Sequence, residues 1–204
     1  MINSFSAKAL LGFAVVAWMQ MGTLESLAQG TFEIVRTGDS SLTIQRKGII
    51  INSDQSLLQF QFAFSTEEEV VPGTFLDSAT ASLQAVNDPA ALLIIATLDR
   101  SGATWAPESP GAIPIDPDSI QRSGIPMPGL QPVLSHSSAF AVKVQIPIAL
   151  QNRELNFYLD LFDNGDGLRS LAALGEITLV PEPGVISLTM GGLASLLLMR
   201  IRRR

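Results

Sequence analysis

The stretch Leu57-Leu58-Gln59-Phe60-Gln61-Phe62-Ala63-Phe64 indicates the fold class of this chain. Successive side chains of a β-strand point to opposite faces, so Phe60, Phe62 and Phe64 would share one face. Three large aromatic side chains on one face predict a strand that is buried on that side.

Short runs of the same period follow one another from Thr31 to Val180, separated by Gly, Asn, Asp and Pro, and helical periodicity is hard to find. Strands are expected over residues 31–36, 41–51, 57–64, 80–86, 91–98, 139–148, 155–162 and 176–180. A brief apolar run within residues 87–95 could instead contain a short helix, because periodicity alone does not assign it. Strands without intervening helices predict an all-β domain, an antiparallel β-sandwich of jelly-roll type.

Residues 101–138 hold seven of the twelve prolines in the chain. This proline-rich stretch is not expected to form regular secondary structure, and a loop of this length is either functional or disordered. It contains Trp105 and the single histidine, His136. An exposed Trp could stack on a sugar, but we favour a Trp that pins the loop to the core.

Composition and charge limit the classes of partner. The chain has 204 residues, of which 47% are hydrophobic, and long apolar runs lie at its two ends. Setting these ends aside leaves one domain, residues 29–179. Residues 29–183 hold eight Lys and Arg against eighteen Asp and Glu, a net charge of −10. Such a surface repels phosphate backbones, so nucleic acid is not an expected partner. The chain has no Cys, which excludes disulfides and thiol chemistry.

The first 28 residues have the features of a secretory signal peptide. Lys8 precedes an apolar run over residues 9–19, and the small residues Ser26 and Ala28 follow. Signal peptidase is expected to cut after Ala28. The alternative, a buried core helix, is disfavoured because the segment is nowhere amphipathic.

The last 25 residues combine three features in order. Val180 is followed by Pro181, Glu182 and Pro183, and residues 185–199 carry no charge. The chain then ends in a basic cluster that contains Arg200, Arg202, Arg203 and Arg204. The uncharged run predicts a short transmembrane helix with its basic end in the cytoplasm, which would place residues 29–183 outside the inner membrane. A permanent single-span anchor would have the same orientation.

Residues 180–204 closely resemble the PEP-CTERM sorting signal of exported bacterial proteins. The resemblance implies recognition of Pro181, Glu182 and Pro183 by an exosortase, a membrane-embedded processing enzyme, with cleavage close by. It also implies a Gram-negative bacterium, since family members are mostly envelope or extracellular proteins of bacteria that make exopolysaccharide. The approach to the tripeptide, a strand, an Asp/Gly-rich turn and a final strand, resembles the same family.

The densest acidic cluster contains Asp160, Asp163 and Asp166, which are candidate ligands for Ca²⁺. The spacing does not match an EF-hand, because Gly165 falls where a ligand should be. Asn164-Gly165 and Asp166-Gly167 are also typical of hairpin turns, and we favour the turn over a metal site.

No catalytic constellation stands out. His136 has serines beside it, but the chain has no G-x-S-x-G motif. The run Glu67-Glu68-Glu69 is interpreted as an exposed turn rather than as a catalytic pair. No enzyme activity, catalytic residue, metal or cofactor is therefore expected.

The sequence as a whole predicts an exported cell-surface or extracellular-matrix protein with a structural or adhesive role. Its expected partners are signal peptidase, the exosortase and, before processing, the inner membrane. A carbohydrate-binding module for exopolysaccharide is the alternative, although Trp105 and Tyr158 are a small supply of aromatic side chains. A glycan-active hydrolase is a third class, and it would need paired carboxylates in a cleft.

Overall fold

The computed structural model describes residues 31–53, 55–71, 73–129 and 134–181. The predicted signal peptide with its cleavage site at Ala28, and the predicted tail from Glu182 through Pro183 to the arginine cluster, lie outside these residues. The chain divides into the units Met1–Thr31 and Phe32–Arg204, and every element below belongs to the second unit. Within the described residues, no helix has the length and apolarity needed to cross a membrane.

The described chain is all-β and forms two antiparallel sheets. Sheet A has the order β1-β10-β3-β8-β7, and β11 also pairs with β3; sheet B has the order β2-β9-β4-β5-β6. The strands of sheet A are β1 (Glu33–Arg36), β3 (Leu57–Thr66), β7 (Ile120–Gly124), β8 (His136–Gln145), β10 (Ser170–Leu174) and β11 (Thr178–Val180). Those of sheet B are β2 (Thr43–Ile50), β4 (Ser78–Ala85), β5 (Asp88–Asp99), β6 (Gly102–Trp105) and β9 (Glu154–Phe162). Two short 3-10 turns, η2 (Pro117–Ser119) and η3 (Ile148–Leu150), lie between strands.

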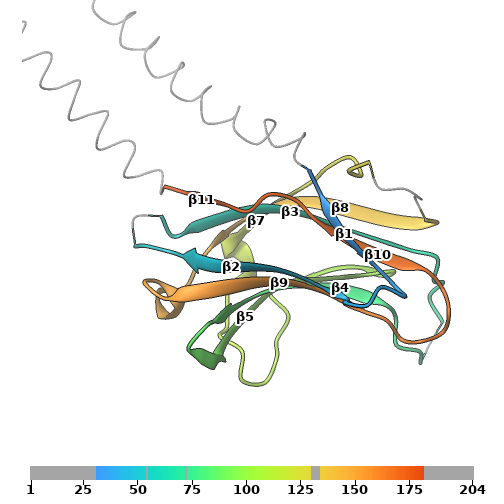
Figure 1. Cartoon of the computed structure of the whole chain (residues 1–204), viewed down its shortest axis with the longest axis horizontal. Helices are drawn as coiled ribbons and strands as arrows, with labels where there is room; N and C mark the ends of the chain where they lie inside the picture. Colours follow the sequence, from blue (N-terminus) through green and yellow to red (C-terminus); the bar gives the residue numbers. More distant parts are fainter. Residues whose placement is uncertain (1–30, 54, 72, 130–133, 182–204) are drawn as a thin grey trace, which may run out of the picture. The chain divides into compact units, whose positions relative to one another are not determined.

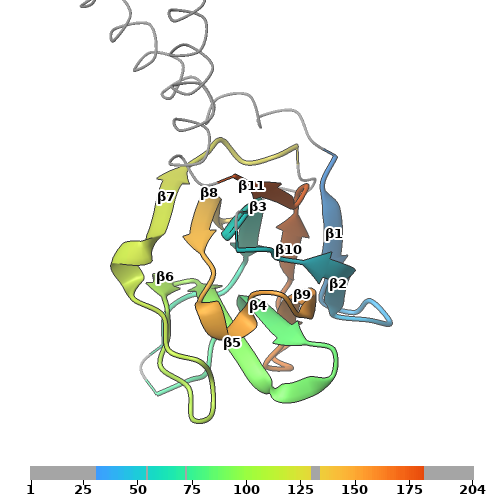
Figure 2. The same cartoon turned by 90° about the vertical axis from the view of Figure 1, so that its left-hand side faces the viewer.

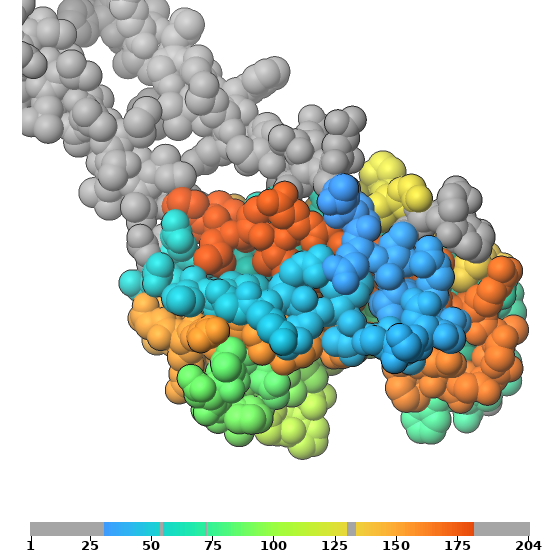
Figure 3. Space-filling view, viewed as in Figure 1, coloured from blue at the N-terminus to red at the C-terminus, as the bar shows by residue number. Residues whose placement is uncertain are grey.

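The two sheets stack as layers, with β3 and β8 in the upper layer of Figure 1 and β2, β9 and β4 in the lower one. Figure 2 shows β1 and β2 along one side of the stack and β6 and β7 along the other. In Figure 3, the blue and cyan atoms of residues in and around β1 and β2 cover the side of the sandwich that faces the viewer. The space between the layers is filled by one large cluster of buried hydrophobic side chains.

Strand β3 confirms the alternation seen in the sequence. Phe60, Phe62 and Phe64 are all at most 1% exposed and belong to the cluster between the sheets. The rings of Phe60 and Phe157 meet edge to face with centroids 4.8 Å apart, which joins β3 to β9 across the layers. Such aromatic pairs add stability beyond their buried area.

The proline-rich stretch differs from its predicted irregularity. Residues 102–105 form β6 at the edge of sheet B, and residues 120–124 form β7 at the edge of sheet A. Four of the seven prolines lie between these two strands and three follow β7, and edge strands need fewer ladder hydrogen bonds than central ones. The helix considered within residues 87–95 is also wrong, because β5 runs through this stretch.

The turn after β9 is not a hairpin. Strand β9 belongs to sheet B and β10 to sheet A, so residues 163–169 cross from one sheet to the other. Gly165 and Gly167 do adopt positive φ values of 80° and 81°. The local turn chemistry was therefore predicted, but the partner of the next strand was not.

The outer faces of the two sheets differ. Every residue of β3 is buried, because a second hydrophobic cluster covers the outer face of sheet A. That cluster includes Ala63, Ala139 and Leu171, with Phe32 and Met127 packed against it. In sheet B, β9 instead alternates between buried and half-exposed residues from Leu155 to Leu161, so its outer face stays accessible.

Candidate functional site

The outer face of sheet B carries a shallow groove of about 410 Å³, within the usual range for ligand pockets. All four of its main strands contribute to it. The lining residues are Thr43, Thr80, Ser82, Gln84, Leu92, Ile94, Tyr158 and Asp160. We call this surface the sheet B groove.

The register of the strands arranges the groove in cross-strand rows. Thr43, Asp160, Thr80 and Thr97 follow one another across β2, β9, β4 and β5. The neighbouring row is Gln45, Tyr158, Ser82 and Ile94, and a third row joins Asn156, Gln84 and Leu92. Every second residue of a strand faces the same side of the sheet. The residues that alternate with these rows face the core, so the side chains of the rows lie on the outer face.

Hydrogen bonds between neighbouring strands hold the polar side chains of the groove in place. Thr43 Oγ1 donates to Asp160 Oδ1 at 2.6 Å, and the hydroxyls of Thr80 and Thr97 lie 3.0 Å apart. Gln84 Nε2 donates to the backbone carbonyl of Pro89 at 3.0 Å. A preorganised polar surface of this kind loses less conformational entropy when it binds a ligand.

Tyr158 lies in the middle row and is the only tyrosine of the chain. Its hydroxyl oxygen accepts hydrogen bonds from Gln45 Nε2 at 2.9 Å and from Asn156 Nδ2 at 3.2 Å. A phenol has two acceptor lone pairs and one donor proton. The two amides occupy the acceptor side, which leaves the phenol proton to donate elsewhere.

The three calcium candidates of the sequence do not converge. Asp160 lies in the sheet B groove, Asp163 Oδ1 accepts from Gly165 N at 2.8 Å, and Asp166 Oδ1 accepts from Leu168 N at 2.8 Å. Nowhere in the described ranges do three His, Asp or Glu side chains gather so that they could hold a metal ion. Two of the three carboxylates thus serve the inter-sheet turn itself.

Asn164 connects this turn to the loop between β3 and β4. Its backbone N–H donates to Asp77 Oδ1 at 2.8 Å, and its side-chain amide donates to Glu68 Oε1 at 2.7 Å and to the Phe75 carbonyl at 2.9 Å. Glu68 Oε2 accepts from the backbone N–H of Asp77 at 2.7 Å. Burial raises the pKa of Glu68, and the charges of Asp77 and Asp166 add to this rise. We call Glu68, Asp77 and Asn164 the inter-loop lock.

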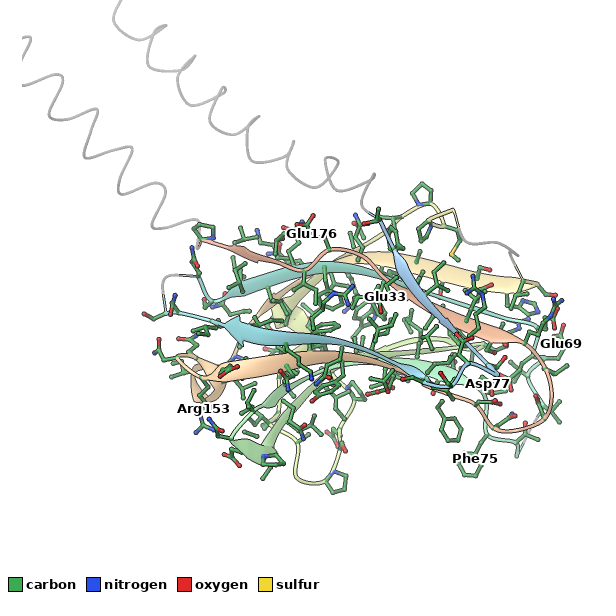
Figure 4. The ribbon with its side chains drawn as sticks, in the orientation of Figure 1. Glu33, Glu69, Phe75, Asp77, Arg153 and Glu176 are labelled. Carbon is green, nitrogen blue, oxygen red and sulfur yellow. The ribbon has the colours of Figure 1, made fainter. Side chains whose placement is uncertain are left out.

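The glutamates on either side of Glu68 form ion pairs. Arg169 binds Glu67 and lowers the pKa of that carboxyl through its side-chain hydrogen bond. His136 Nε2 lies 3.2 Å from Glu69 Oε1, and this hydrogen bond lowers the pKa of Glu69, with Arg100 adding to the effect. Figure 4 shows Glu69, Phe75 and Asp77 at one end of the sandwich and Arg153 at the other. The interpretation of the three glutamates as an exposed turn is therefore wrong for Glu68, which is 2% exposed.

His136 lines a second pocket of about 320 Å³ together with Arg100 and Ser137. The Ser137 hydroxyl lies 2.7 Å from that of Ser65, and its other hydrogen bond goes to the Leu134 carbonyl. In the described part of the chain, no serine hydroxyl is hydrogen-bonded to the His136 ring, so the nucleophile and base pairing that acyl transfer needs is not formed there.

Trp105 pins its segment to the core, as the sequence predicted. Its ring meets those of Phe140 at 5.2 Å and Phe62 at 6.2 Å, both edge to face. The Arg122 guanidinium lies over it, 5.0 Å from the ring centroid. Trp105 is thus held between core and cation and lies outside the sheet B groove.

The sequence analysis singled out Tyr158 and Asp160 separately, but it did not predict the polar rows to which they belong. The residues of these rows that it did not predict are Thr43, Gln45, Thr80, Ser82, Gln84 and Asn156. Their signal is present as the polar half of each period-2 strand, but pairing registers decide which of them become neighbours.

Comparison of the chain with protein-family models, with curated proteins and with solved structures finds no match.

Proposed function

We propose that this protein is exported and sorted through its PEP-CTERM-type tail to the cell surface or the extracellular matrix, where its domain has an adhesive or structural role. Strand β11 is the structural observation that supports this proposal. It pairs with β3 up to Val180, opposite Leu57, and Pro181 follows immediately. The strand pairing of β11 therefore ends directly before the proposed sorting tripeptide, which suits a tail that is removed without harm to the sheet.

The strand order supports the finer assignment to the jelly-roll class. Sheet A places β1, β10, β3 and β8 side by side, and sheet B places β2, β9, β4 and β5 side by side. Strands that follow one another in the chain, such as β1, β2 and β3 or β8, β9 and β10, thus lie alternately in the two sheets. This is the arrangement of two interlocked Greek keys. In this scheme β6 and β7 are an insertion that extends one edge of each sheet.

The contacts of the acidic side chains support a non-enzymatic role. Glu67 and Glu69 form ion pairs, and Glu68 and Asp77 hold the inter-loop lock. These carboxylates stabilise loops, whereas glycoside hydrolysis needs two carboxylates on either side of a substrate.

A carbohydrate-binding module is the second candidate function. One observation favours it: the outer face of sheet B is open and polar, whereas a hydrophobic cluster covers the outer face of sheet A.

The sorting proposal is tested by the intact mass of the protein from wild-type cells and from cells that lack the processing enzyme. We expect the wild-type mass to lack the residues after a point near Pro183, and the mutant cells to retain them. Ala substitution of Glu182 should also preserve the tail in wild-type cells, whereas Ala substitution of Glu176, a matched glutamate outside the tripeptide, should not. Retention of the tail in wild-type cells would overturn the sorting proposal and leave a permanently anchored protein.

A further inference from the structure

The sheet B groove has the chemistry of a surface built for hydroxyl-rich ligands. Its rows present the hydroxyls of Thr43 and Thr80 and the amide of Gln84, beside the half-buried Leu92 and Ile94, whereas Ser82 is only 6% exposed. Hydroxyls and amides both donate and accept hydrogen bonds, and so do the hydroxyls of a sugar. The apolar side chains at one edge of the groove suit the C–H faces of a sugar ring.

The charge of the groove selects against other polymers. Asp160 is its one charged lining residue, and the domain around it is acidic, with a net charge of −10 over residues 29–183. An anionic chain would meet repulsion there. A lipid or an apolar peptide would bury the polar rows without partners, which costs free energy for each group.

The groove has a hydrogen-bond donor and an acceptor that can bond to a ligand. Tyr158 keeps its phenol proton free to donate, because Gln45 and Asn156 donate to its oxygen. Thr43 occupies one oxygen of Asp160, and the other remains available as an acceptor. A donor and an acceptor therefore lie in adjacent rows on the same strand, two residues apart on β9.

We propose that the sheet B groove binds an uncharged polysaccharide that lies across the four strands, with Tyr158 donating to it and Asp160 accepting from it. Strands about 4.8 Å apart give the groove a width of roughly 14 Å from β2 to β5, enough for several contacts along one chain. This inference rests on the second candidate function and gives it a ligand class and contact residues.

The test uses the full chain, purified in a zwitterionic detergent, in affinity gel electrophoresis. The gels contain dextran, mannan, xyloglucan or galactomannan as neutral polysaccharides, or alginate as an acidic one. We expect at least one neutral polysaccharide, and not alginate, to retard the protein. Retardation by alginate alone, or by none of the five, would overturn the inference.

Conservative variants then locate the site. Tyr158→Phe keeps the ring and removes one donor, so we expect the affinity to fall about fivefold, and Asp160→Asn should lower it about tenfold because it loses a charged acceptor. Gln45→Ala should also weaken binding, whereas Gln121→Ala, on β7 of the other sheet, is the matched control and should not. Equal affinities for all four variants and wild type would overturn the inference.

The single tyrosine offers a direct readout that does not depend on variants. Full-length protein labelled with ¹³C at the tyrosine Cζ position gives one ring signal, from Tyr158. The polysaccharide that retards the protein should shift this signal, and the acidic control should not. Retardation without a shift would place binding elsewhere and overturn the inference. Tail removal is measured separately by mass, so either proposal can fail while the other stands.

Discussion

At the scale of single residues, Glu67, Glu68 and Glu69 show how neighbours in sequence acquire opposite acid–base properties. Glu67 pairs with Arg169, Glu69 pairs with His136 and Arg100, and the pKa values of both carboxyls are lowered. Glu68 points into the inter-loop lock, where burial raises its pKa. The difference follows burial, since Glu68 is 2% exposed whereas Glu67 is half-buried and Glu69 is exposed.

These shifts predict an order of titration. A carboxyl-detected NMR titration should give Glu68 a higher pKa than Glu67 and Glu69, because desolvation disfavours its charged form while the flanking residues have cationic partners. By linkage, Glu68 stabilises the fold below its unfolded pKa, and this contribution is lost as the pH rises through its folded pKa. The contributions of Glu67 and Glu69 have the opposite sign and are lost as the pH falls. A Glu68 pKa at or below those of its neighbours would contradict the assigned environment.

The inter-loop lock depends on Asn164, whose side-chain amide donates to Glu68 and to the Phe75 carbonyl. Asn164→Ala removes the donor to buried Glu68 and should lower the free energy of unfolding by about 2 kcal/mol, since a buried acceptor is left without a partner. Urea denaturation measures the change. Asn87→Ala, in the exposed β4–β5 turn, is the control and should stay within about 0.5 kcal/mol of wild type. Equal effects would show that the lock contributes little.

At the scale of elements, β3 is the strand around which sheet A is built. It pairs with β10, β8 and β11, and both of its faces are buried. Phe62 contacts the rings of Phe60, Trp105 and Phe140 from this strand.

Removal of the Phe62 ring should destabilise the domain. Phe62→Ala leaves a cavity among three aromatic side chains and should lower the free energy of unfolding by about 3 to 5 kcal/mol, as measured by urea denaturation. Phe75→Ala is the matched control, because Phe75 is 84% exposed and projects away from the sandwich beside Asp77 in Figure 4. Its effect should be within about 0.5 kcal/mol. Similar losses for both would mean that Phe62 is not held in the core.

Sequence periodicity located eight of the eleven strands in the described part of the chain, since apolar and other residues alternate along them. Strand β10 escaped prediction since Ser170–Leu174 is buried on both faces and has no polar alternation. Strands β6 and β7 escaped it because they are edge strands of four and five residues among prolines. The pattern thus fails where a strand has no alternation of polar and apolar residues or is too short to show a period.

At the scale of the whole molecule, the site depends on pairings between distant parts of the chain. Thr43 and Asp160 are 117 residues apart, yet their side chains share a 2.6 Å hydrogen bond. Such neighbours follow from strand order and register, which local sequence does not specify. The polar residues of the groove could therefore be predicted as outward-facing, but their assembly into rows could not.

Strand β11 sets the limit to which the domain can be shortened. A chain of residues 29–180 should be as stable as one that continues through Pro183, because pairing with β3 ends at Val180. A chain of residues 29–176 loses β11, including Leu179, which packs on the core, and should lose about 2 kcal/mol of unfolding free energy. Thermal unfolding of the three chains checks this, and equal stabilities would show β11 to be dispensable.

The described chain both enters and leaves the domain through sheet A, by β1 at one end and β11 at the other. Any attachment that continues from either end is therefore fastened to one layer of the sandwich. The opposite layer, with its polar rows, has no chain terminus of its own. The domain thus has a built-in polarity, because both ends of the described chain lie in one layer and the open polar rows lie on the other.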